Sequence, residues 1–97
     1  MAIISFSNCK LKKIPPALCQ LTKITRLYFV YNGLTTLPKE FSCLENLTNL
    51  NLQANHFSEI PDALCKLRKL KILSLQRNRI TNEGLSKRML ISNIFDW

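Results

Sequence analysis

Glycine and long apolar runs are both scarce in this chain, and each scarcity excludes a class of protein. The 97 residues include two glycines, far apart at Gly33 and Gly84, so the sequence has no glycine-rich loop that could hold a phosphate. No apolar run approaches the roughly 20 residues that a membrane-spanning helix requires. The opening residues, MAIISF, lack the basic segment and the long apolar stretch of a secretory signal peptide. We therefore expect a cytoplasmic protein.

Side chains that carry catalysis or bind metals are also few. There is one histidine, His56, and the four cysteines, Cys9, Cys19, Cys43 and Cys65, form no C-x-x-C pair. A zinc site needs ligands that converge on one point, and nucleophilic catalysis needs a base beside the nucleophile. Neither pattern occurs here. The sequence therefore predicts a protein that is not an enzyme, that has no metal or cofactor, and whose cysteines are reduced thiols.

Acidic residues are scarce as well. Six Asp and Glu stand against fourteen Lys and Arg, which gives a formal net charge of +8. Residues 1–39 hold six basic side chains and no acid, and four of the six acids fall between Glu40 and Asp62. A basic protein attracts acidic partners, including phosphates and anionic membranes. Because the basic residues are scattered over several expected surfaces, we interpret most of this charge as surface solvation and expect neither a nucleic-acid nor a membrane partner.

What the sequence does contain is an internal repeat. Blocks of 23 residues cover 1–23, 24–46 and 47–69, and a fourth block starts at residue 70 and keeps the pattern to residue 81. A fixed period of this length is the signature of a solenoid, in which each repeat packs against its neighbours. The recurring apolar residues are Ile4, Leu27, Leu50 and Leu73 at position four and Phe6, Phe29, Leu52 and Leu75 at position six.

The pattern L-x-x-L-x-L-x-x-N/C-x-L resembles the leucine-rich repeat. Three apolar-proline pairs resemble those of the 23-residue intracellular class of this family, found in Ras-pathway and scribble-type scaffold proteins: Ile14-Pro15, Leu37-Pro38 and Ile60-Pro61. The resemblance covers residues 1–81. It implies an α/β solenoid with a short parallel concave sheet and short helical or 3-10 turns on the convex side. It also implies a protein-binding role, as a scaffold or adaptor in intracellular signalling.

Alternation within each block predicts which side chains are buried. Residues around 3–7, 26–30, 49–53 and 72–76 are expected to form strands, with positions four and six pointing into the core. Positions 18 and 21 should close the core from the convex side. At position nine, a side-chain amide can both donate and accept hydrogen bonds between neighbouring turns. The structural ladder predicted from this position consists of Cys9, Asn32, Asn55 and Asn78.

The two ends of the chain depart from the repeat. The fourth block lacks the proline, and residues 82–97 are predicted to form a longer helix that caps the stack, with binding to a partner as the alternative. Met1 already stands at block position one, so we expect the chain to be a fragment of a longer stack. Pairing of the exposed first edge with a second copy, or marginal stability, are the alternatives. The residues expected to line that edge are Ile4, Phe6, Leu11 and Ile14.

The predicted binding surface comes from the same resemblance. In leucine-rich repeats, positions three, five, seven and eight point outward from the concave sheet, and no acid occurs at these sixteen positions here. Tyr and Arg are enriched among the residues that carry most binding energy, so Arg26, Tyr28 and Tyr31 are the predicted anchors for a polar or acidic protein partner. The alternative is that Tyr28 and Val30 only pair with side chains on neighbouring strands. The full predicted partner-binding set is Arg26, Tyr28, Val30, Tyr31, Asn49, Asn51, Gln53, Ser74, Gln76 and Arg77.

Two other functions are consistent with the sequence. The first is electrostatic binding to nucleic acid or an anionic membrane, which would appear as a steep loss of affinity with salt. The second is a targeting or regulatory role within a larger signalling enzyme whose catalytic domain lies outside these residues. The basic clusters that would serve the first function are Lys10, Lys12 and Lys13 and, further on, Lys66, Arg68, Lys69 and Lys71.

Overall fold

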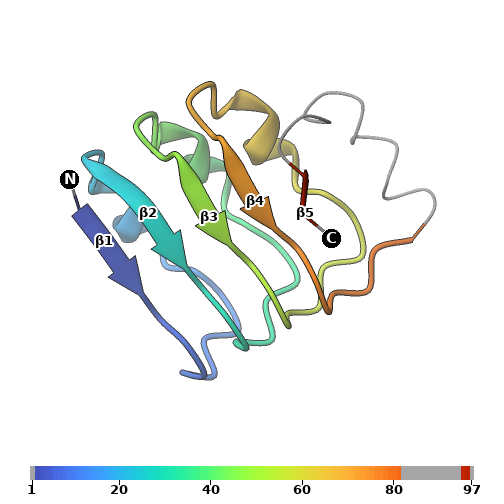
Figure 1. The fold of residues 1–97 in the computed structure, drawn as a ribbon. Coiled ribbons are helices and arrows are strands. Elements are labelled where there is room, and N and C mark those ends of the chain that lie inside the picture. The colour runs from blue at the N-terminus through green and yellow to red at the C-terminus, as the bar shows by residue number, and fades with distance from the viewer. Residues whose placement is uncertain (1, 82–94, 97) are drawn as a thin grey trace.

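The computed structural model describes residues 2–81 and 95–96, which form one sheet of parallel strands backed by short helices (Figure 1). The strands lie in chain order, so each strand is hydrogen-bonded to the next one along the sequence. In chain order the elements are β1 (Ala2–Ser5), η1 (Pro16–Gln20), β2 (Ile24–Tyr28), η2 (Lys39–Cys43), β3 (Asn49–Asn51), η3 (Asp62–Lys66), β4 (Ile72–Ser74) and β5 (Phe95–Asp96), where η denotes a 3-10 helix.

The register of the sheet follows the 23-residue period. The residues that share block position four lie opposite one another on neighbouring strands: Ile4, Leu27, Leu50 and Leu73. Backbone hydrogen bonds continue past the strand ends, where Tyr31 N donates to Gln53 O at 3.1 Å. The strands are therefore shorter than the predicted segments, although pairing extends further. The predicted fold class, a parallel solenoid with 3-10 turns, is confirmed.

The core lies between the sheet and the 3-10 helices. Positions four and six of the second to fourth repeats are at most 1% exposed, namely Leu27, Phe29, Leu50, Leu52, Leu73 and Leu75. Phe41, Leu44 and Leu64 meet them from the helix side and are completely buried. Burying an apolar side chain of this size contributes about 1.5–3 kcal/mol. The predicted alternation of inward and outward side chains is thus confirmed in these repeats.

Each 3-10 helix begins directly after a repeat proline. Pro15, Pro38 and Pro61 have φ of −62°, −66° and −60° and an extended ψ. The proline ring fixes φ near these values, and its missing N–H is not needed at this position. The short helices that close the convex side are therefore 3-10 helices of five residues each. Within residues 2–81 and 95–96, no helix is long and apolar enough to cross a bilayer.

The first repeat departs from the predicted burial. Leu21, at block position 21, was expected to close the core but is 49% exposed, whereas Leu44 at the same position is completely buried. The reason is that η1 packs against η2 on one side only, while η2 packs against both η1 and η3. Ile14, expected at a bare edge, is buried at 4% exposure, and Ile4 is partly buried against the core.

The C-terminal segment is described only at residues 95–96. These two residues form β5, which pairs in parallel with β4, so the helix predicted over 82–97 is wrong at this point. The rest of that predicted helix lies outside the described residues. β5 satisfies backbone hydrogen-bonding groups that would otherwise leave β4 as the edge of the sheet.

Candidate functional site

The outward positions of the strands form straight rows across the sheet. One row, at block position three, consists of Ile3, Arg26, Asn49 and Ile72, and a second, at position five, consists of Ser5, Tyr28, Asn51 and Ser74. Neighbouring strands in a sheet are about 4.8 Å apart. The structure therefore brings the second-repeat residues Arg26 and Tyr28 beside the amides of the third repeat.

The predicted contact residues differ in how much surface they offer. Arg26, Tyr31 and Arg77 are exposed, and Tyr31 reaches 67%. An intermediate group is half-buried: Tyr28, Val30, Asn49, Asn51, Gln53 and Gln76. Ser74 is 8% exposed and offers the least surface of the predicted contact residues. Its side chain is short, and it lies between β3 and β5 rather than at an edge.

Block position eight has an unusual backbone conformation that the sequence did not reveal. Asn8, Tyr31, Ala54 and Arg77 all have positive φ, between 55° and 63°. The left-handed region costs a residue with a Cβ roughly 1–2 kcal/mol, and Asn tolerates it better than most residues. The position recurs in every repeat, where the chain leaves the strand. Tyr31 and Arg77 are therefore exposed at a backbone position that glycine or asparagine would occupy at lower cost.

The amides of the third and fourth repeats are fixed by hydrogen bonds. Gln53 Nε2 donates to Gln76 Oε1 at 2.8 Å, and Asn51 Oδ1 accepts from the backbone N–H of Gln53 at 3.0 Å. Each side-chain amide has two N–H groups and an oxygen with two lone pairs. The three amides are thus oriented, and they retain hydrogen-bonding capacity for polar groups above the sheet.

The asparagines at position nine join neighbouring repeats from inside. Asn55, which is 2% exposed, is the best-bonded example. Its Oδ1 accepts from the backbone N–H of Asn32 at 3.0 Å and of Leu34 at 3.1 Å. Its Nδ2 donates to the carbonyl oxygens of Phe29 at 2.6 Å and Leu52 at 3.0 Å. One side chain therefore bonds to the backbone of two repeats.

The same bonds recur at Asn78 and Asn32, but not at Cys9. Asn78 Nδ2 donates to Leu52 O at 2.8 Å in the preceding repeat. Asn32 Oδ1 accepts from the backbone N–H of Cys9 at 2.9 Å. The thiol of Cys9 is exposed and donates to Ser7 O, within its own repeat, at 3.4 Å. Cys9 thus receives a bond from the ladder through its backbone without extending the ladder with its side chain.

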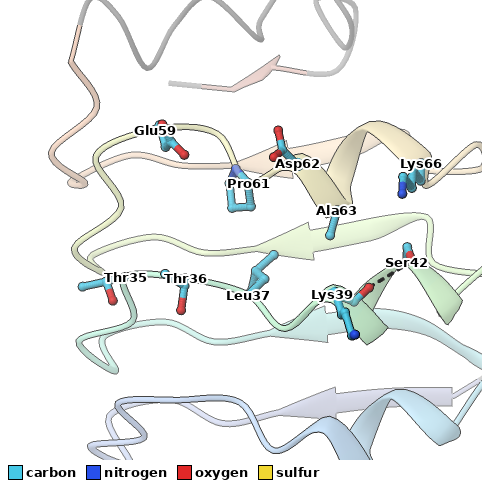
Figure 2. A pocket seen from close by; sticks show the side chains of 10 residues that line it. All are labelled: Thr35, Thr36, Leu37, Lys39, Ser42, Glu59, Pro61, Asp62, Ala63 and Lys66. Atoms are coloured by element: carbon cyan, nitrogen blue, oxygen red, sulfur yellow. Dashed lines mark hydrogen bonds between the residues drawn. The ribbon is translucent and has the colours of Figure 1, made fainter.

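A hollow of about 300 Å³ lies away from the concave rows, between the return segments of the second and third repeats (Figure 2). It is bordered by residues within 35–42 and 59–66. None of the predicted contact residues borders it. This hollow could not be predicted from the sequence, because it depends on how two return segments are spaced.

All four cysteines are free thiols. Burial raises the pKa of the Cys19 thiol, and the nearby Cys43 and Glu40 raise it further. Because the thiolate is the nucleophile and the metal ligand, this shift makes Cys19 less reactive. Over the described part of the chain, no group of three or more His, Cys, Asp or Glu residues is placed to hold a metal ion.

The known proteins that are similar to this chain also contain the repeat. A family model described as "Leucine rich repeat" matches residues 2–57. A solved structure of a leucine-rich repeat protein from Leptospira interrogans has a TM-score of 0.81 and 28% sequence identity, over 89% of this chain. The chain spans 22% of the length of that protein. No curated protein sequence matches the chain.

Proposed function

The chain belongs to the leucine-rich repeat family, and on this premise we propose that its concave face binds an acidic or polar segment of another protein. Domains of this family generally mediate protein–protein interaction and are typically not catalytic. The family does not specify the partner, because function depends on the side chains that a fold presents.

One observation carries the proposal. The sixteen outward positions of the four repeats include no acid, and Asp96 of β5 follows only after Ser74 at the end of the position-five row. Arg26 and Arg77 are exposed at the second and fourth repeats. A guanidinium group can form two parallel hydrogen bonds to a carboxylate. Tyr31, in the same repeat as Arg26 and 67% exposed, adds an aromatic surface of the kind enriched at interface centres. The oriented amides between them match a polar partner backbone or side chain.

The cellular location and role of the protein extend this proposal. We propose that the protein acts in the cytoplasm as a non-catalytic scaffold or adaptor, in intracellular signalling. Support comes from the apolar-proline pairs that resemble the intracellular class and from the four cysteines, none of which is in a disulfide.

Affinity capture with matched baits tests the concave face. The baits are the wild-type chain, the Arg26→Ala/Tyr28→Ala double variant, and Arg68→Ala, which removes an exposed arginine outside the predicted contact set. Loss of central Arg and Tyr contacts typically costs 2 kcal/mol or more, which is about 30-fold in affinity. The partner should be retained by the wild type and Arg68→Ala and lost by the double variant. Equal capture by all three baits would exclude the concave face.

A salt titration separates this function from nonspecific electrostatic attachment. Binding to heparin or to anionic vesicles that falls steeply with salt, and that Arg26→Ala/Tyr28→Ala leaves unchanged, would favour the basic clusters instead. Binding that is lost in Arg26→Ala/Tyr28→Ala supports the concave face.

A further inference from the structure

Two hollows on the flank of the stack adjoin each other. The hollow of Figure 2 lies between the second and third repeats, and another of about 380 Å³ lies between the first and second. Both are bordered by Thr36 and Leu37, so they lie on either side of the return segment of the second repeat, and we call the two hollows together the flank groove. The groove crosses the three repeats at the place where each return segment follows its strand. It lies on a different face from the concave rows.

The floor of the flank groove is apolar. Pro15, Pro38 and Pro61 border it at the same position of successive repeats, with Leu37 and Ala63 between them. In Figure 2, the side chains of Leu37, Pro61 and Ala63 lie between the two return segments. Prolines present no N–H group, so a ligand on this floor is held mainly by apolar contact rather than by backbone donors.

The charge of the groove changes sign along the stack. At block position thirteen the exposed residues are Lys13, Thr36 and Glu59 in successive repeats. At position sixteen, exposed Lys39 of the second repeat is followed by exposed Asp62 of the third. Figure 2 shows the Lys39 and Asp62 side chains pointing in opposite directions along the stack. The first two repeats are thus basic and the third is acidic at these positions.

One further charge borders the hollow at its far side. Lys66, at the end of η3, lies on the opposite side of the hollow from Glu59 (Figure 2). It follows Asp62 by four residues, and because a 3-10 helix has three residues per turn, the two side chains are not on the same face of η3. Glu59, across the hollow from Lys66, therefore marks the acidic end of the groove.

We propose that the flank groove binds an extended peptide segment that carries an acidic residue and a basic residue about three positions apart, with apolar residues between them. Two repeat steps separate Lys13 from Glu59, or about 10 Å at the strand spacing. An extended chain advances about 3.3 Å per residue, so three residues cover this distance. The acidic residue lies over Lys13 and Lys39, the apolar residues lie on Leu37 and the prolines, and the basic residue lies beside Glu59.

The size of the hollows favours a peptide over a small molecule. Sites that enclose a small molecule occupy about 300–1,000 Å³, and each hollow alone, at about 300 and 380 Å³, is at the lower limit of this range. An extended peptide segment can contact both hollows at once and reach Lys13 at one end of the flank groove and Glu59 at the other.

Fluorescence anisotropy with defined peptides tests the proposal on the full chain. The probe is a labelled, end-blocked Gly-Glu-Pro-Leu-Lys-Gly, compared with versions in which both charged residues are Gln, both are Glu, or both are Lys. An exposed ion pair contributes about 1.4- to 5-fold in affinity. With two such pairs, the mixed-charge peptide should bind about 2- to 25-fold more tightly than the neutral one, and more tightly than either like-charged version.

Reversing the charge of Glu59 tests the proposal through a change in which peptide the chain prefers, rather than through a loss of binding. Glu59→Lys makes the acidic end basic, so the variant should prefer the doubly acidic peptide over the mixed one. Glu45→Lys is the matched control, because it makes the same charge change at an exposed residue that does not border the groove. It should keep the wild-type preference. Thermal unfolding of both variants checks that each is folded.

Amide chemical shifts locate the bound peptide. Perturbations from the mixed-charge peptide should centre on Thr36, Leu37 and Ala63. The proposal is overturned if the neutral peptide binds equally well, if Glu45→Lys changes the preference as Glu59→Lys does, or if the perturbations centre on Arg26 and Asn49. The last result would leave the concave face as the peptide site, so this test and that of the proposed function fail separately.

Discussion

The first repeat and the two that follow have the same sequence pattern but not the same environment. Leu44 in the second repeat is completely buried, and Leu21 at the same position of the first is 49% exposed. Asn55 bonds to the backbone of two repeats, whereas the Cys9 thiol bonds within its own turn. In a solenoid, each repeat buries its core against its neighbours. The difference shows that a residue's burial depends on the repeats beside it as much as on its position in the pattern.

The largest effect on the free energy of unfolding is expected from the same leucine-to-alanine change at block position 21 of the first two repeats. Leu44→Ala should lower the free energy of unfolding by about 3–5 kcal/mol, because it leaves a cavity in a packed core. Leu21→Ala should lower it by about 1 kcal/mol or less, because half of that side chain already contacts water. Urea unfolding followed by circular dichroism measures both. Equal losses would mean that the first repeat is as well packed as the second.

The ladder residues provide the next contrast. Asn55→Ala removes an amide whose buried backbone partners, including Asn32 N and Phe29 O, then lose their hydrogen bonds. Each unsatisfied buried group costs about 1–3 kcal/mol, so we expect a loss of about 2–4 kcal/mol in the free energy of unfolding. Cys9→Ala should cost about 0.5 kcal/mol or less, as expected of an exposed surface position. A large loss at Cys9 would show that its thiol supports the stack.

The period of the sequence was sufficient to predict some of these features and not others. Because apolar residues recur every 23 positions and the pattern resembles the leucine-rich repeat, the parallel register of Leu27, Leu50 and Leu73 could be predicted. The exposure of Leu21 and the burial of Ser74 could not, because both depend on what lies beside the strand or helix.

The backbone conformation at block position eight and the flank groove could not be predicted from the sequence pattern for a different reason. Positive φ at Tyr31 and Arg77 is a property of the turn geometry, and neither residue type indicates it. The flank groove combines Thr36 and Glu59, which are 23 residues apart and each unremarkable as a surface residue. Such sites emerge only when the repeats are stacked.

A smaller effect is expected from pH. Because burial raises the pKa of Cys19 in the folded chain, the unfolded chain ionises at lower pH than the folded one. Below the ordinary thiol pKa, Cys19 is protonated in both states and its ionisation does not affect the free energy of unfolding. Above that pKa, the thiol ionises more readily in the unfolded chain, so the free energy of unfolding falls. Urea unfolding between neutral and alkaline pH measures this fall. Cys19→Ala should lessen it, and an identical pH dependence in that variant would rule out this source.

The smallest change in the free energy of unfolding is expected at block position eight, where stability and partner binding should change in opposite directions. The first repeat has Asn8 there, whereas the second has exposed Tyr31 in the same left-handed conformation. Tyr31→Asn should raise the free energy of unfolding by about 0.5–1 kcal/mol, because Asn adopts this region at lower cost. It should also weaken capture of the concave-face partner, since the aromatic surface is lost. Ala54→Asn is the control, because it makes a similar backbone gain without removing a ring. If both variants capture the partner as well as the wild type does, Tyr31 is not a binding residue, and the contrast between the first two repeats is one of packing alone.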